Sequence, residues 1–155
     1  MSTDAETQSE VLAALATWVV KDGVGLGGLS FAVRDLALAV AWAGLPTGPL
    51  SEKAGNAALQ LQLAGAAHFL ATDHVELRRW LVDADWLRRD GYGHEYHRVP
   101  AQDLAADARV AADALSALDV ASWVTDVRLH HTTRRDQRRQ AWQATQAHRG
   151  ETRHE

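Results

Sequence analysis

The residues best suited to chemistry are arginines and histidines that cluster between residues 73 and 99. Arg78 and Arg79 fall on a predicted helix, and arginine suits bidentate contact with guanine or phosphate. A predicted hairpin directly after this helix carries further basic side chains. Where a helix and hairpin are joined in this way, the helix can enter the major groove of DNA while the hairpin touches phosphates. The candidate DNA contacts are Arg78, Arg79, His74, Arg88, Arg89, His94 and Arg98.

Carboxylates in the same segment oppose this interpretation. Six carboxylates lie among these arginines and histidines: Asp73, Glu76, Asp83, Asp85, Asp90 and Glu95. Arg79 is spaced to pair with Glu76 at i−3 and with Asp83 at i+4 on one helix face. The whole chain carries a net charge of −4, which does not favour non-specific binding to a phosphate backbone. A salt-bridged, solvated face that binds no DNA therefore remains an open alternative.

A second basic run lies near the C-terminus. It comprises Arg128, Arg134, Arg135, Arg138 and Arg139 with His130 and His131, and Asp136 is the only carboxylate between residues 127 and 149. Arg134, Arg135, Arg138 and Arg139 are candidate phosphate contacts. Two other interpretations stay open, namely a solvated terminal helix and a tail that folds on a partner.

Other chemistry has little support in the sequence. Cysteine is absent, which excludes thiolate catalysis and disulfides. His68, His74 and a histidine of the hairpin lack a recognised metal-ligand spacing, while His94 and His97 should face opposite sides of one strand. The glycine-rich segment 22–28 lacks the lysine and hydroxyl residue of a phosphate loop and suits a flexible connection. We therefore expect no enzyme, no metal and no cofactor.

The hydrophobic spacing predicts mainly helical elements around these bases. Helices are expected at about residues 3–21, 31–43, 51–64 and 73–84, with Ser30, Ser51 and Asp73 as N-caps. Asp90-Gly91 marks the turn of a β-hairpin that ends before Pro100. Helical spacing returns from residue 101, and a last helix from Asp119 extends to about Trp142 and frays from Gly150 onward.

One segment of the chain resembles a bacterial family. It comprises residues 72–83, the run Trp86-Leu87-Arg88-Arg89-Asp90-Gly91-Tyr92-Gly93, and Tyr96. The family is the domain of unknown function 2087 family. The resemblance covers about residues 49–99. It implies a winged-helix-like fold and a role as a transcriptional regulator, without an established activity. The chain departs from the family where Ala54-Gly55 precedes Asn56, and at Asp85, where the family favours glycine.

These observations together predict a mainly α fold, with a winged-helix unit of three helices plus a β-hairpin wing and extra N- and C-terminal helices. The expected domains are an N-terminal helical segment (1–48), the winged-helix domain (49–100) and a C-terminal extension with a basic, partly frayed tail (101–155). The expected function is a DNA-associated transcriptional regulator or accessory factor. The alternative is a protein-interaction module of the same shape.

The expected partners are double-stranded DNA, a protein, or a second copy bound through the helix that holds Trp123 and Val127. The sequence contains no run of about 18 apolar residues and starts with a polar, acidic segment, which is unlike a membrane span or a secretory signal. A cytoplasmic location is expected.

Overall fold

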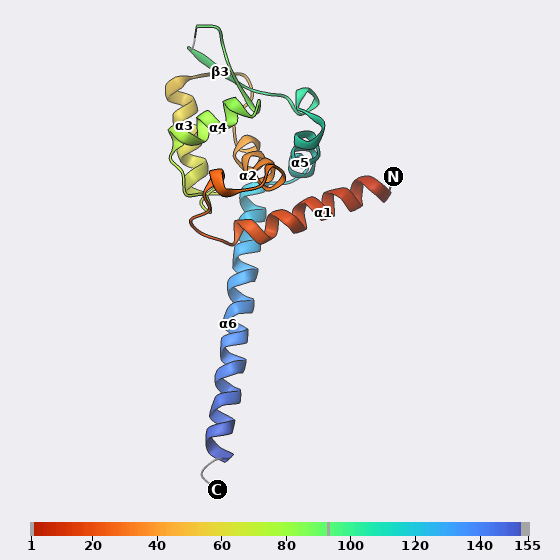
Figure 1. Ribbon diagram of the computed structural model, residues 1–155, viewed down its shortest axis with the longest axis vertical. Coiled ribbons are helices and arrows are strands. Elements are labelled where there is room, and N and C mark those ends of the chain that lie inside the picture. Colours follow the sequence, from red (N-terminus) through yellow and green to blue (C-terminus); the bar gives the residue numbers. More distant parts are fainter. Residues whose placement is uncertain (1, 93, 153–155) are drawn as a thin grey trace.

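The computed structural model describes residues 2–92 and 94–152 of the chain. Figure 1 shows a helical body that contains a small sheet, with a helix extending from it at each end of the chain. The elements in chain order are α1 (Ser2–Val19), α2 (Phe31–Ala43), β1 (Pro49–Ser51), α3 (Glu52–Ala64), α4 (His74–Asp83), β2 (Leu87–Arg89), β3 (Glu95–Arg98), α5 (Ala106–Ser116) and α6 (Val120–Thr152). Short 3-10 turns occupy Leu26–Gly28 and Ala101–Asp103.

The three predicted N-caps are confirmed. The Ser30 hydroxyl accepts a hydrogen bond from the Val33 amide at 3.3 Å, and the Ser51 hydroxyl accepts one from the Ala54 amide at 3.1 Å. The Asp73 carboxylate accepts from the Glu76 amide at 2.8 Å. Each cap satisfies an amide that the first helical turn would otherwise leave unpaired. The local sequence therefore sets where α2, α3 and α4 begin.

A three-stranded antiparallel sheet holds the wing. The predicted hairpin forms from β2 and β3, with Arg88 opposite His97, and β1 pairs with the other edge of β3, with Leu50 opposite Tyr96. The strand order is thus β1-β3-β2. Strand β1 was not predicted, because it has only three residues, the last of which is also the N-cap of α3, and so short a segment gives no periodic signal. The mainly α prediction is confirmed, and the element order is that expected of a winged-helix unit.

The core joins α2 to the sheet and to α4. Trp42 of α2 and Trp86 next to β2 are buried, with ring centroids 5.8 Å apart. The Trp42 indole donates a 2.8 Å hydrogen bond to the Val99 carbonyl. Helix α2 therefore supplies the first of the three helices of the winged-helix unit, followed by α3 and α4. Helix α2 thus contacts elements on both sides of residue 48, and the predicted division into domains at that residue stays a prediction.

Two connecting segments differ from expectation. The glycine-rich segment 22–28 is pinned to the body, because the Val24 amide donates to the Phe69 carbonyl at 2.9 Å and the Val24 carbonyl accepts from the Ala71 amide at 2.7 Å. The prediction of a flexible connection is wrong there. Helix α6 also continues through Gly150 to Thr152 rather than fraying, and residues 153–155 lie outside the described residues.

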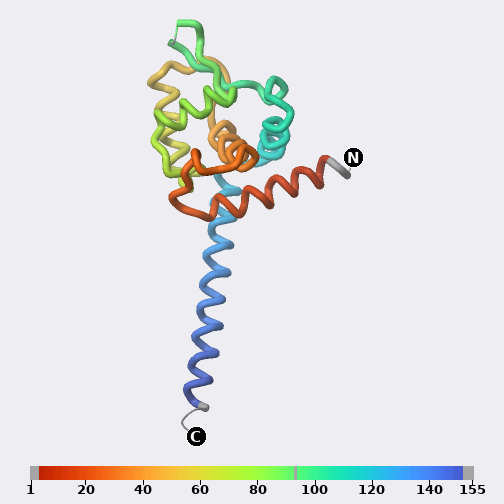
Figure 2. The backbone as a smooth tube through the Cα atoms, in the orientation of Figure 1, coloured from red at the N-terminus to blue at the C-terminus, as the bar shows by residue number. Residues whose placement is uncertain are grey.

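The two terminal helices leave the body in different directions, α1 toward one side and α6 along the long axis (Figure 2). Leu15 and Val19 in the last turns of α1 are buried, whereas Asp4 to Thr7 are exposed. Val124 of α6 is buried, but all residues from 129 to 151 are exposed. Helix α1 also lies along α5, where Gln8 Nε2 donates to the Ala114 carbonyl at 3.2 Å, whereas α6 stands in solvent from residue 129 to residue 151.

Candidate nucleic-acid interface

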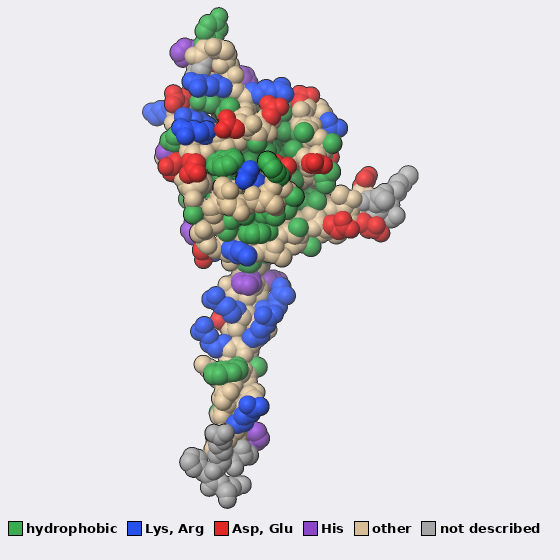
Figure 3. Space-filling view, in the orientation of Figure 1, with side chains coloured by type: hydrophobic (Ala, Val, Ile, Leu, Met, Phe, Trp, Pro, Cys, Tyr) green, Lys and Arg blue, Asp and Glu red, His purple; other side chains and the backbone are tan. Residues whose placement is uncertain are grey.

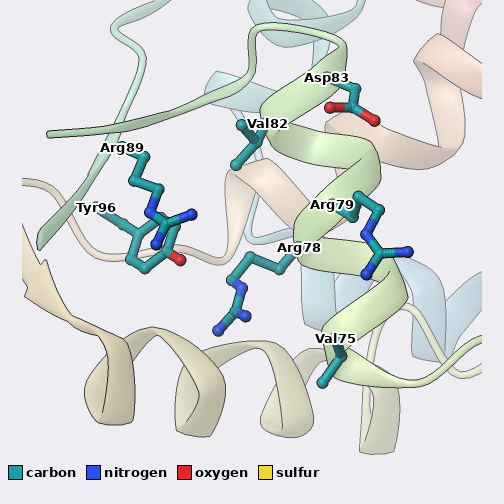
Figure 4. A pocket seen from close by; sticks show the side chains of 7 residues that line it. All are labelled: Val75, Arg78, Arg79, Val82, Asp83, Arg89 and Tyr96. Atoms are coloured by element: carbon teal, nitrogen blue, oxygen red, sulfur yellow. The ribbon is translucent and has the colours of Figure 1, made fainter. Parts of the chain in front are cut away.

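An open groove lies between α4 and the wing, on the side where a winged helix would meet DNA. It has a volume of about 260 Å³. Figure 4 shows Arg89 and Tyr96 across the groove from the side chains of α4. Its lining residues are Val75, Arg78, Arg79, Val82, Asp83, Arg89 and Tyr96. Three guanidinium groups thus face this groove with a single carboxylate.

Arg78 is held inside the domain. Its Nη1 donates to Asn56 Oδ1 of α3 at 2.6 Å and lies 3.4 Å from Glu52 Oε1. Its side chain is only 18% exposed, and its guanidinium lies 5.3 Å from the centre of the Tyr96 ring. The sequence analysis expected Arg78 to contact a DNA groove, but its hydrogen bonds are directed at α3. Arg78 positions α4 against α3 and forms the floor of the groove.

Arg79 and Arg89 are the exposed guanidinium groups of this groove. Neither forms an ion pair with another residue that the structure describes. The expected pairs of Arg79 with Glu76 and with Asp83 are not formed. The Arg89 guanidinium lies 5.9 Å from the centre of the Tyr96 ring. The Arg89 side chain is exposed, so its N–H donors are accessible to solvent. Two positive charges are therefore presented together on one side of the wing.

Arg98 is also engaged within the body, where the sequence analysis expected a phosphate contact. Its guanidinium stacks 3.9 Å from the Trp42 ring centre and donates to the Leu45 carbonyl at 2.9 Å. Burial lowers the pKa of Arg98 from its ordinary value, because desolvation disfavours the charged form. Its position fits a structural clamp between α2 and β3.

The remaining predicted contacts do not line the groove. Arg88 points away from Arg89 by strand alternation and lies 3.5 Å from Asp85. His74 Nδ1 is 3.4 Å from Gln60 Nε2, and His94 is exposed, with its backbone amide donating to Asp90 Oδ1 at 2.9 Å. Only Arg78, Arg79 and Arg89 of the predicted set are brought together. The structure does not gather His68, His74 and a wing histidine, and the described residues hold no metal-binding group of three or more such side chains.

A second basic groove lies where α6 leaves the body beside the end of α1. Its volume is about 550 Å³. It is lined by Ala16, Thr17, Val20, Lys21, Val127, His131, Arg134, Arg135 and Arg138. Arg134, Arg135 and Arg138 were predicted as phosphate contacts, whereas the contribution of α1 was not predicted. Arg139 does not line this groove.

Tyr96, which lines the groove, and Asn56, which accepts a hydrogen bond from Arg78, were not predicted as site residues. Alternation along β3 could have placed Tyr96 on the inner face, but nothing local to Asn56 indicates that Arg78 lies beside it. That contact depends on the packing of α3 against α4, which joins residues 22 positions apart.

The model of a family described as an uncharacterized protein conserved in bacteria, DUF2087, matches residues 30–98. This confirms the resemblance over that segment, which runs from the cap of α2 to the end of β3. The matched segment begins at residue 30, whereas the winged-helix domain was expected to begin at residue 49. The matched segment therefore includes α2, which packs in the core with α4 and the sheet. No curated protein and no solved structure matches the chain. None of the described helices is long and apolar enough to cross a membrane.

Proposed function

We propose that this protein is a DNA-associated transcriptional regulator or accessory factor without enzymatic activity. The observation that carries the proposal is the pair of exposed, unpaired guanidinium groups of Arg79 and Arg89 in the groove between α4 and the wing. In a winged helix this edge faces the DNA duplex. Arg79 on the helix suits contact with base edges, while Arg89 on the wing suits contact with phosphate.

The negative charge of the body indicates that this groove contributes only modestly to affinity for DNA. Between residues 130 and 152, α6 carries five arginines and two carboxylates, a net charge of +3. Because the whole chain carries −4, the rest of the chain carries −7. Specific orientation would then come from the groove, and additional attraction to phosphates from Arg134, Arg135, Arg138 and Arg139.

The test is fluorescence anisotropy with duplex fragments of genomic DNA over a salt series. We expect affinity at about 50 mM salt that falls with a clear negative log–log slope as salt increases. The double variant Arg79→Ala/Arg89→Ala should lose about tenfold or more in affinity, since each contact contributes about 1 kcal/mol or more.

Arg88→Ala is the matched control, because it removes the same charge from the opposite face of the same strand. It should change affinity by about twofold or less, as expected for an exposed charge. A salt slope near zero, or full affinity in the double variant, would contradict the proposal.

A second candidate function is a protein-interaction module that keeps the winged-helix shape. The outer face of α4 supports it, since Glu76 and Asp83 flank Arg79 around a second hollow that also contacts Trp80. This face carries more negative than positive charge, which would repel phosphates and suit a basic or apolar protein surface. A normally folded protein without DNA affinity would favour this function.

A further inference from the structure

A further cavity lies at the start of α6, inside the body rather than along the basic arm that Figure 3 shows below it. Its volume is about 400 Å³. Small-molecule sites usually measure about 300–1,000 Å³. Leu115 and Leu118 contribute apolar wall, while Gln62, Arg98 and Asp119 contribute polar groups. The cavity therefore has the size and the mixed lining of a site for a small ligand.

Arg98 supplies the positive charge of this cavity. Its Nη1 donates to the Leu45 carbonyl, and its remaining N–H donors have no partner among the described residues. It also forms no ion pair with a residue that the structure describes. A half-buried cation without a counter-ion is poorly solvated. A carboxylate bound beside Arg98 would compensate for this loss and match the planar guanidinium with two parallel hydrogen bonds.

Asp119 supplies the negative charge. Its Oδ1 accepts a hydrogen bond from the Ser122 amide at 3.2 Å and so caps the start of α6. Its Oδ2 has no partner among the described residues, and the carboxylate forms no ion pair with Arg98 or with another described cation. Arg98 and Asp119 are the two charged side chains in the lining. Two opposite charges thus line one cavity without pairing with each other.

The Gln62 amide occupies space that Gly44 leaves free. A Cβ on Gly44 would collide with this amide, so the side chain of Gln62 lies directly against the end of α2. The amide forms no hydrogen bond with another residue that the structure describes. It can donate to a carboxylate or accept from an ammonium group. Gln62 is therefore a third polar group available to a ligand.

We propose that this cavity binds a small zwitterion, an apolar α-amino acid, with its carboxylate at Arg98 and its ammonium group at Asp119. The argument is charge complementarity, since such a molecule carries one charge of each sign, as the cavity does. The Gln62 amide would donate to the carboxylate, and the apolar side chain would lie against Leu115 and Leu118. The ligand would then connect α3 and β3 to the start of α6.

Other ligands match this cavity less well. A phosphate would meet the carboxylate of Asp119, and a simple amine would meet the guanidinium of Arg98, so each would face a like charge. Duplex DNA is too wide to enter a cavity of this size. The inference does not depend on DNA binding by the groove beside the wing, because no described residue lines both.

The experiment is isothermal titration calorimetry of the full chain with L-valine, L-leucine, L-isoleucine and L-methionine. We expect at least one of them to bind with a Kd of about 1 mM or lower. The matched probes are the same molecule without its amine and without its carboxylate, which are isocaproate and isopentylamine for L-leucine. Each should bind at least about tenfold more weakly than the amino acid, because one charged group of the cavity then stays unpaired.

Two variants change the cavity while Arg98 keeps its contacts with the body. Asp119→Asn removes the charge but keeps a side-chain oxygen that caps α6, and it should weaken binding at least about tenfold. Gly44→Ala displaces the flexible end of Gln62, and the φ of −87° at Gly44 suits alanine. It should weaken binding about threefold or more, through the loss of one hydrogen bond. The matched control is Asp113→Asn, an exposed aspartate of α5 outside the cavity, which should stay within about twofold of the wild type.

Circular dichroism verifies that each variant keeps its helices. Failure of all four amino acids to bind overturns the inference. Affinity for either matched probe equal to that for the amino acid also overturns it, because the ligand would then use one charge of the cavity alone. Full affinity in Asp119→Asn overturns it as well, since the amino acid would then bind elsewhere on the protein.

Discussion

At the scale of single residues, arginines of the same segment have different tasks. Arg78 bonds to Asn56, Arg98 stacks on Trp42, and Arg79 and Arg89 stand in solvent. The sequence places all four near the predicted DNA surface, but it does not distinguish a guanidinium that reaches another helix from one that reaches water. Burial and partners decide which of them are available for binding.

Arg98→Ala tests the structural role of this half-buried arginine. Removing the guanidinium eliminates the cation–π contact with Trp42 and the hydrogen bond to the Leu45 carbonyl. We expect the free energy of unfolding to fall by about 1–3 kcal/mol, measured by urea denaturation. Arg88→Ala, an exposed arginine, should cost about 0.5 kcal/mol or less. Equal effects of the two substitutions would contradict the clamp role of Arg98.

At the scale of elements, the junction between α4 and the wing depends on an unfavourable backbone angle. Asp85 has a φ of 62°, in the left-handed region that favours glycine. The Asp85 amide bonds to the Val82 carbonyl at 3.1 Å and the Trp86 amide to the Leu81 carbonyl at 2.9 Å. This pattern ends a helix with a left-handed residue, usually glycine, and turns the chain into β2. The chain therefore keeps the geometry despite its departure from the family preference.

Asp85→Gly should relieve the strain at this junction. We expect the free energy of unfolding to rise by up to about 1 kcal/mol, since glycine adopts positive φ without a steric penalty. Asp85→Ala should lower it by about 1 kcal/mol, because alanine lacks both the freedom of glycine and the local hydrogen bonds of aspartate. Both are measured by urea denaturation, with Arg88→Ala as the control for the lost Asp85 ion pair. The reverse order of stabilities would contradict this explanation.

At the scale of the whole molecule, the chain separates charge between its body and α6. The +3 of residues 130–152 extends away from a remainder of −7, along a helix about 50 Å long in total. Such an asymmetric molecule attracts acidic partners to one end and basic partners to the other. An arm that contacts phosphates would use this asymmetry.

Removal of residues 130–155 separates the arm from the body. We expect the thermal midpoint of unfolding to change by about 2 °C or less at about 1 M salt, where charge attraction between arm and body is screened, because residues 130–151 are all exposed. A fall of about 5 °C or more at high salt would show that the arm stabilises the body of its own chain.

The sequence alone determined the starts of α2, α3 and α4, the hairpin and the mainly α fold, because caps, turn residues and hydrophobic spacing act over a few neighbouring positions. It also located the basic segments. Tertiary structure decided which arginines are free, where β1 joins the sheet and how α1 meets α6. Those features arise from contacts between residues far apart in the chain, such as Arg78 with Asn56 and Arg128 with Val19, and local spacing carries no record of them.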